Sequence, residues 1–443
     1  MSNQPDSLTQ AIYQHFSPAP VSTAEAPTIY VPLDAARGNT HVVTRLARKI
    51  RLTAKWSCQV LAGHKGSGKS TELNRLQQEL ESPKDPADKK FFTVFVKTDD
   101  DTDRNDVDFP DLLIAIVRQL AAQLKSREAI TLTPGYFKSR LDELKKLAMS
   151  EVSFDGIDID TGFGKIATSL KASPTARDAI RKAMEPDTGN WLAAANDVIG
   201  KATLELVKLG YAGLVILVDD LDKMVVRPHP QASCSTAEHL FVNRAGQLTA
   251  FQCHLVYTIP LSLAYSSPEA TIRANFGGEF PVVPMTKIAT KPPHSKPYEA
   301  GIELFRKIIA NRLAAAGATE AQAFHDADTR DELIQLSGGQ PTELMTLVRQ
   351  ALITDGLPIK AAALHLAKNE TQRAYARQFR AEHWPIIEDV RATGIHVPTT
   401  ATEPYFRELL DSRAVLQYVN DEEWYALNPM VAALTPPIAG KKA

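Results

Sequence analysis

The stretch that most constrains this chain runs from Cys58 to Thr71 and reads CQVLAGHKGSGKST. It joins a short apolar run to the complete G-x-x-x-x-G-K-[ST] pattern, and a helix-like run follows. Glycines let backbone N–H groups curl around an anion without a Cβ clash, and the helix directs the positive end of its dipole to the same place. The stretch therefore predicts a strand, a phosphate-binding loop and a helix. The predicted nucleotide-binding residues are Gly63, His64, Lys65, Gly66, Ser67, Gly68, Lys69, Ser70 and Thr71.

Two side chains of this loop have predicted roles. We expect the Lys69 ammonium to reach the β- and γ-phosphates of a nucleotide and to act in catalysis. We expect the Ser70 hydroxyl to ligate Mg²⁺. The alternative, without nucleotide binding, is a glycine-rich turn before an ordinary helix.

A second stretch, from Gly213 to Asp222, reads GLVILVDDLD and is an apolar strand that ends in acids. In the order expected after a phosphate loop, Asp219 would hold Mg²⁺ through water or Ser70, and Asp220 would act as general base on the attacking water. Thr258 ends another apolar run, at a position where a polar side chain could sense the γ-phosphate. The alternative for Thr258 is an ordinary strand-end threonine.

Composition excludes several classes of protein. The 443 residues predict two to three domains, and the formal net charge of -2 gives no global attraction to nucleic acid or membrane. No stretch approaches 18 apolar residues, so we expect no membrane partner. The polar amino terminus shows no secretory signal, and the three cysteines have no metal spacing. We therefore expect a cytoplasmic protein.

The order of patterns predicts an α/β core followed by helices and a hairpin. A short strand or an extended piece is expected at 29–33. Two alternating runs near the carboxyl end predict a hairpin typical of a winged helix. Residues 131–190 fit the core pattern poorly, so we interpret them as an insertion with basic helices at 137–147 and 176–184. The expected domains are an amino-terminal arm (1–28), a P-loop core (29–290), a helical lid (291–355) and a winged-helix-like domain (356–443).

Together these motifs resemble the AAA+/STAND superfamily of P-loop ATPases, close to origin-recognition-type and KAP-type members. The resemblance rests on GHKGSGKST, LVILVDDLDK, the polar strand end at Thr258 and SGGQP, and it covers about residues 29–352. It implies a parallel sheet in 5-1-4-3-2 order with a helical lid, and it implies ATP and Mg²⁺ as cofactors. By resemblance, Gly339 and Pro341 match a G-x-P lid motif near the adenine, and Arg37 matches a nucleotide-covering segment.

The resemblance also implies the pace of hydrolysis. Most AAA+ members have Glu where Asp220 stands, and the shorter carboxylate suggests slow turnover suited to a switch. The γ-phosphate would also need a cation from a neighbouring subunit. Candidates for that cation, each with an equal alternative as a surface residue, are Arg177, Arg181, Arg273 and Arg312.

The main functional hypothesis is an ATP-binding and ATP-hydrolysing switch that forms a homo-oligomer and controls a separate effector protein. By resemblance, many such bacterial ATPases serve antiviral defence. The alternative is a DNA-binding initiator or loader that uses the winged helix, although residues 421–423 (DEE) make the wing acidic. A small-molecule kinase and a catalytically inactive scaffold are further alternatives, and the intact loop and acidic pair disfavour the scaffold.

Overall fold

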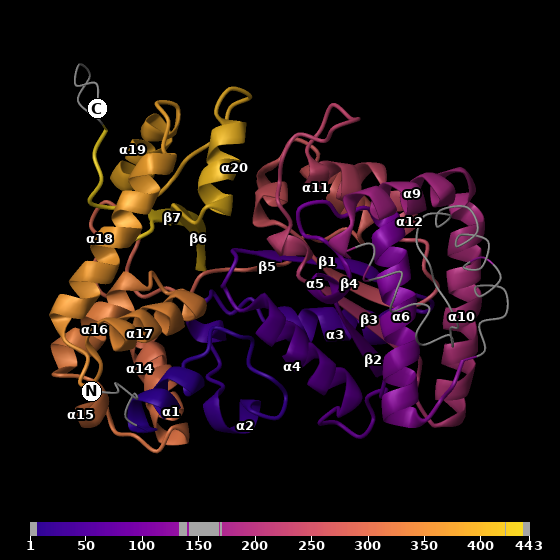
Figure 1. The fold of residues 1–443 in the computed structure, drawn as a ribbon, viewed down its shortest axis with the longest axis horizontal. Coiled ribbons are helices and arrows are strands. Elements are labelled where there is room, and N and C mark those ends of the chain that lie inside the picture. The colour runs from indigo at the N-terminus through magenta and orange to yellow at the C-terminus, as the bar shows by residue number, and fades with distance from the viewer. Residues whose placement is uncertain (1–6, 133–139, 141–167, 169–170, 421, 437–443) are drawn as a thin grey trace. The chain divides into compact units, whose positions relative to one another are not determined.

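The computed structural model describes residues 7–132, 140, 168, 171–420 and 422–436 (Figure 1). Apart from residue 140, the basic helix expected at 137–147 lies outside these residues. The chain divides into two compact units. The sheet unit comprises Val42–Ala62 and Arg75–Pro281, and the lid unit comprises Met1–His41, Gly63–Asn74 and Val282–Ala443.

Five strands of the described residues form one sheet in the order β2-β3-β4-β1-β5. They are β1 (Cys58–Gly63), β2 (Phe92–Lys97), β3 (Leu214–Asp219), β4 (His254–Thr258) and β5 (Val282–Val283). The pairs β1–β4, β4–β3 and β3–β2 are parallel. All of β3 and β4 is buried, which explains why their sequences are continuous apolar runs rather than alternating ones. The expected 5-1-4-3-2 order is confirmed, and the core is an AAA+-like P-loop fold.

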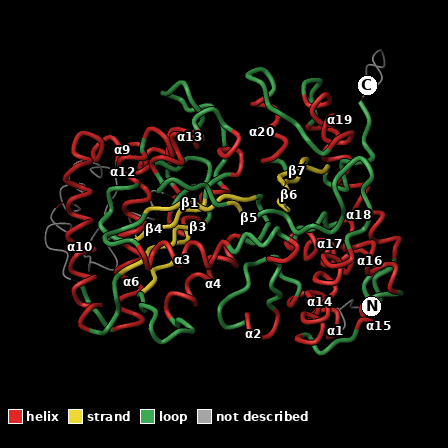
Figure 2. Tube along the Cα trace, turned by 180° about the vertical axis from the view of Figure 1, so that it is seen from behind, coloured by secondary structure: helices red, strands yellow, loops and turns green. Residues whose placement is uncertain are grey.

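Helices complete the sheet unit. They are α3 (Val42–Leu52), α5 (Thr98–Asp101), α6 (Phe109–Glu128), α9 (Pro174–Met184), α10 (Thr188–Lys208), α11 (Thr236–Glu238), α12 (Ala245–Leu248) and α13 (Glu269–Asn275), with α4 (Lys69–Glu81) continuing from the loop. Helical turns of other types lie at Glu185–Asp187, Leu221–Lys223, His239–Asn243 and Leu261–Tyr265. The long helices α6 and α10 lie side by side (Figures 1 and 2). A capping box between Asp108 and Asp111 starts α6, as the sequence Asp-Phe-Pro-Asp favours.

The lid unit is mainly helical. It contains α1 (Ser7–His15), α2 (Ala26–Ile29), a turn at Asp34–Ala36, α14 (Glu299–Ala315), α15 (Glu320–Ala323), α16 (Ala327–Leu336) and α17 (Pro341–Asp355). The amino-terminal helix α1 packs beside α14 and buries Ile12, and Phe16 directly after the helix is also buried (Figure 1). No strand forms at 29–33: α2 ends at Ile29, and Tyr30 continues in an extended conformation, which is the second of the two expected alternatives. Pro27 favours a helical first turn in α2, and Pro32 removes a backbone donor that a strand would need.

The last part of the lid unit is winged-helix-like. It comprises α18 (Ala361–Gln378), α19 (His383–Thr393), α20 (Glu403–Asp411), β6 (Val415–Asn420) and β7 (Glu422–Leu427). β6 and β7 pair antiparallel from Val415 opposite Leu427 to Asn420 opposite Glu422, which confirms the expected hairpin. Tyr418 and Trp424 stack across it with ring centroids 4.4 Å apart. We call α18–α20 with this hairpin the C-terminal module.

Candidate functional site: the phosphate loop and the acidic strand end

The phosphate loop follows β1 and turns directly into α4. Gly63, Gly66 and Gly68 have φ angles of 151°, 83° and 101°, in the region that favours glycine. At Gly66, a Cβ atom would overlap the carboxamide nitrogen of Gln340. The loop conformation therefore needs glycine both for its backbone and for the close approach of the lid.

The Lys69 ammonium is buried and holds the loop in its curled form. It donates hydrogen bonds to the carbonyl oxygens of Gly63 and His64, both over 2.7 Å. The cation thus sits at the start of the loop, where it can meet the phosphates of a nucleotide. Thr71 is tied to the amino-terminal segment, because its hydroxyl accepts a hydrogen bond from the Val21 N–H over 3.2 Å.

Arg37 lies against the loop backbone. Its Nη2 donates to the Ser67 carbonyl oxygen over 2.5 Å, and its Nε donates to the Thr286 hydroxyl over 3.1 Å. Its Nη1 forms a buried ion pair with Glu72 over 3.4 Å, in the first turn of α4. The residue that resemblance assigned to a nucleotide-covering segment is thus one that fixes the shape of the loop.

The lid reaches the loop through the GQP segment. Gly339 has φ 73° and a Cβ there would overlap the Thr286 carbonyl oxygen, while Pro341 occupies the first turn of α17. Between them, the fully buried Gln340 donates from Nε2 to the Lys65 carbonyl oxygen over 2.6 Å. The contact residue of the motif is therefore Gln340, which sequence analysis did not single out.

His64 points away from the loop into the C-terminal module. Its Nδ1 lies 3.2 Å from the Leu410 carbonyl oxygen, and its Nε2 accepts a hydrogen bond from the Gln417 N–H over 2.8 Å. Burial, followed by the charge of Lys69, lowers the pKa of His64 to about 3. The imidazole is therefore neutral, and both of its nitrogens contact the C-terminal module.

The acidic strand end belongs to the sheet unit. Register places Leu61 of β1 opposite Thr258 of β4, and Val218 of β3 opposite Tyr257. The carboxyl ends of β1, β4 and β3 are therefore aligned, so Thr258 and Asp219 end neighbouring strands at one edge of the sheet. In parallel sheets this is the edge where ligands bind.

The two acids differ in their local structure. Asp219 is buried and its carbonyl oxygen accepts a hydrogen bond from the Thr98 hydroxyl over 2.8 Å. Asp220 is in the left-handed region with φ 73°, which turns its side chain out of the strand direction, and its carboxylate pairs with Lys223. Burial alone would lower the pKa of Lys223, but the hydrogen bond and the charge of Asp220 raise it. A general base at Asp220 would have to act beside this ammonium.

Two buried hydroxyls suit a polar ligand. The Oγ1 of Thr258 in the sheet unit and the Oγ of Ser67 in the lid unit are buried and have no hydrogen-bond partner among the described residues. A buried hydroxyl without a partner costs about 1–3 kcal/mol, so such groups often mark where a ligand binds. Within the lid unit, the Ser67 hydroxyl, the Lys69 ammonium and the left-handed glycines suit the phosphates of a nucleotide.

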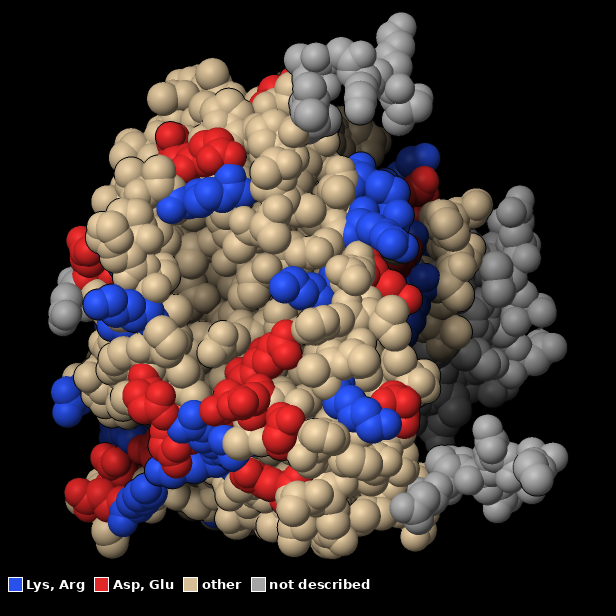
Figure 3. Space-filling view, turned by 90° about the vertical axis from the view of Figure 1, so that its left-hand side faces the viewer, with Lys and Arg blue, Asp and Glu red and all other residues tan. Residues whose placement is uncertain are grey.

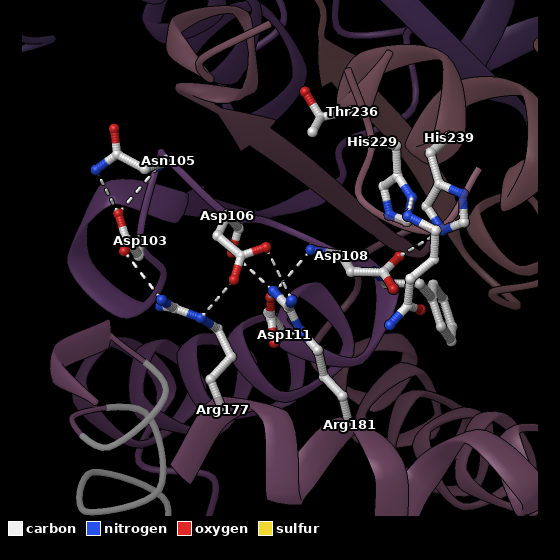
Figure 4. A network of polar contacts seen from close by, with 12 residues as sticks. Asp103, Asn105, Asp106, Asp108, Asp111, Arg177, Arg181, His229, Thr236 and His239 are labelled. Atoms are coloured by element: carbon white, nitrogen blue, oxygen red, sulfur yellow. Dashed lines mark hydrogen bonds and ion pairs between the residues drawn. The ribbon is translucent and has the colours of Figure 1, made fainter. Parts of the chain in front are cut away.

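Two of the four candidate arginines are bound within the sheet unit (Figure 4). The buried Arg177 pairs with Asp103 over 3.1 Å and with Asp106 over 3.0 Å. Arg181 pairs with Asp106 over 3.0 Å and also with Asp111. The two arginines lie one helical turn apart on α9, so both side chains reach this ion-pair network.

The other two candidates differ in exposure. Arg312 is buried in the lid unit, donates to the His15 carbonyl oxygen, and has a pKa lowered by burial. Arg273 on α13 pairs across one helical turn with Glu269, its one ion-pair partner among the described residues, and its side chain is 53% exposed. Of the four, Arg273 has the most exposed side chain.

No protein-family profile and no curated protein matches this chain. Solved structures that resemble it include the Aeropyrum pernix ORC2 protein in ADPNP and ADP complexes, with 11% identity, TM-score 0.43, and coverage of 91% of this chain and 94% of the other. Drosophila ORC bound to DNA gives 13% identity, TM-score 0.40, and coverage of 97% and 90%. Cdc6p from Pyrobaculum aerophilum gives 12%, 0.36, and 94% of both chains. The strand order and the phosphate loop, not these likenesses, define the core.

Within the part of the chain that the structure describes, every helix is too short or too polar to cross a bilayer.

Proposed function

We propose that this chain is an ATP-binding and slowly ATP-hydrolysing switch. The observation that carries the proposal is the phosphate loop itself, with left-handed glycines and a buried Lys69 at its start. The acidic end of β3 supports it, and so does the Thr258 hydroxyl, which has no hydrogen-bond partner among the described residues; both lie where neighbouring strands of the sheet end. The choice of ATP over GTP as the nucleotide rests on the family resemblance alone.

The residues predicted to act in catalysis or to hold the metal each have a role in this proposal. Lys69 binds and neutralises phosphate oxygens, and Ser70 and Asp219 hold Mg²⁺ directly or through water. Mg²⁺, when held there, would neutralise charge on the phosphates. Asp220 orients and deprotonates the attacking water, and Thr258 donates to the γ-phosphate. Because Asp220 has a short side chain paired with Lys223, turnover is slow.

The switch would act through parts of the chain that touch the loop. Gln340 connects the lid to the loop, and His64 connects the loop to the C-terminal module. These contacts support a response of the lid and of the module to the nucleotide. We include in the proposal a homo-oligomer, with Arg273 reaching the neighbouring site, and control of a separate effector protein. The assignments to bacterial defence and to the cytoplasm stay predictions.

An initiator-type ATPase that acts on DNA is the second candidate. The winged-helix-like module favours it, since such folds lay a helix in the major groove. The charges oppose it, because DNA binding requires exposed basic groups. Glu408 on α20 binds Arg380 and His383. On the face shown in Figure 3, Lys and Arg side chains lie among Asp and Glu side chains. A gel shift over a salt series separates the two, because tight binding that weakens steeply with salt requires basic contacts.

Hydrolysis tests the main proposal. Wild-type protein should release phosphate from ATP only with Mg²⁺, and Asp220→Asn should lower the rate about 100-fold or more without weakening ATP binding. Asp222→Asn is the matched control on the same acidic run. Equal turnover in wild type and Asp220→Asn would exclude Asp220 as the base, and phosphate appearing on a second small molecule would favour a kinase.

A further inference from the structure

One imidazole links the phosphate loop to the C-terminal module. His64 is 1% exposed, and its two nitrogens contact two elements that meet at one point of that module. Nδ1 faces the last turn of α20 at the Leu410 carbonyl oxygen, and Nε2 faces the middle of β6 at the Gln417 N–H.

The partners dictate which proton the ring carries. Since Gln417 donates its N–H, Nε2 must be the unprotonated acceptor. Nδ1 then carries the single proton and donates it to Leu410. A second proton would place a donor at Nε2 against the Gln417 N–H, so the contact requires the neutral ring. Lys69 and Arg413 are the charged groups that face it, and both oppose a positive charge there.

The same strand is also anchored to the lid by other contacts. The Gln417 carbonyl oxygen accepts from the Met285 N–H over 3.0 Å, and the Tyr418 hydroxyl donates to the Gly338 carbonyl oxygen over 2.7 Å. These contacts hold β6 without involving the loop. The His64 side chain is different, because its backbone is part of the loop and its carbonyl oxygen accepts from Lys69 over 2.7 Å. A shift of the loop backbone therefore moves the His64 ring together with the Gly63 and His64 carbonyl oxygens that accept hydrogen bonds from Lys69.

We propose that His64 is a positioning residue that couples nucleotide binding to the docking of the C-terminal module. The inference rests on the proposed function. With the ring between Leu410 and Gln417, the loop is held in its curled form, and the docked module and the bound nucleotide stabilise each other. Coupling is reciprocal, so nucleotide protects β6, and a loosened β6 weakens nucleotide binding.

Hydrogen–deuterium exchange on the full chain tests this proposal, with and without a non-hydrolysable ATP analogue and Mg²⁺. Calorimetry measures binding of the same analogue separately. The main variant is His64→Phe, which keeps a ring and removes both hydrogen bonds. His64→Gln is the second variant, since its amide oxygen can accept from Gln417 and should restore part of the effect. His254→Phe is the matched control, because His254 is also buried and accepts a backbone N–H, from Ser57, but lies in the sheet unit.

In wild type, the analogue should slow exchange of the β6 peptide about tenfold. In His64→Phe this slowing should fall below about twofold and analogue affinity should drop about 5- to 20-fold, while His254→Phe behaves as wild type. Equal slowing in wild type and His64→Phe overturns the proposal, as does a wild type that binds the analogue with β6 unchanged. A wild type that binds no analogue overturns the proposed function and the coupling with it.

Discussion

Arg37 donates a hydrogen bond to the Ser67 carbonyl oxygen over 2.5 Å, so a residue outside the phosphate loop fixes the loop's backbone. The same guanidinium pairs with Glu72, and the two side chains are only 5% and 10% exposed. Arg37→Met should lower the free energy of unfolding by about 3 kcal/mol, because it leaves a buried carboxylate without its cation. Urea denaturation measures this.

The control for Arg37 is an arginine pair in solvent. Arg45 and Glu279 pair over 3.1 Å with side chains 55% and 49% exposed. Arg45→Met should cost less than about 1 kcal/mol. Similar losses in Arg37→Met and Arg45→Met would show that the buried pair does not hold the loop.

Gly339 and Gly317 separate backbone strain from close approach. Their φ angles are 73° and 70°, but a Cβ at Gly339 would overlap the Thr286 carbonyl oxygen, whereas a Cβ at Gly317 meets nothing within 4 Å. Gly317→Ala should cost about 1 kcal/mol from the left-handed backbone alone. Gly339→Ala should cost several times more, which the two melting temperatures would show. Equal losses would contradict the packing of the lid described above.

Thr258→Val should separate stability from activity. Its hydroxyl is buried without a partner among the described residues, so its removal should change the unfolding free energy by less than about 1 kcal/mol, or raise it. As a γ-phosphate donor, its loss should lower ATP turnover about 100-fold. Thr93→Val is the control: its hydroxyl donates to Glu81, so stability should fall by about 1 kcal/mol while turnover stays. Unchanged turnover in Thr258→Val would leave Thr258 as an ordinary strand-end residue.

The local parts of the site could be predicted from the sequence, and the long-range parts could not. Glycine spacing alone specifies the loop, and continuous apolar runs specify β3 and β4. The contact from Gln340 to Lys65 spans 275 positions and that from Gln417 to His64 spans 353, so neither leaves a local pattern. His64 stood in the predicted nucleotide site only because it lies within the loop. The one sequence signal of this long-range contact was the presence of a histidine in a loop of mostly small residues.

Stability should depend on pH through His64. Burial lowers its pKa to about 3, against about 6.5 in an unfolded chain. The folded state therefore binds fewer protons, so this contribution is fully present above about pH 6.5 and is lost as pH falls toward 3. Between pH 6 and 4, the unfolding free energy of wild type should fall more steeply than that of His64→Phe, by about 1.4 kcal/mol per pH unit. Replacing the exposed His294 by Phe should leave the slope unchanged, and parallel slopes for wild type and His64→Phe would refute the neutral-ring contact.

The central claim is that the loop from Gly63 to Thr71 binds a magnesium–triphosphate through Lys69. Titration calorimetry of ATP with Mg²⁺ into wild type, Lys69→Ala and the exposed-lysine control Lys84→Ala tests it most directly, with circular dichroism to verify folding. We predict saturable binding by wild type and Lys84→Ala, and none by a folded Lys69→Ala. Equal ATP affinity in wild type and Lys69→Ala would contradict the account.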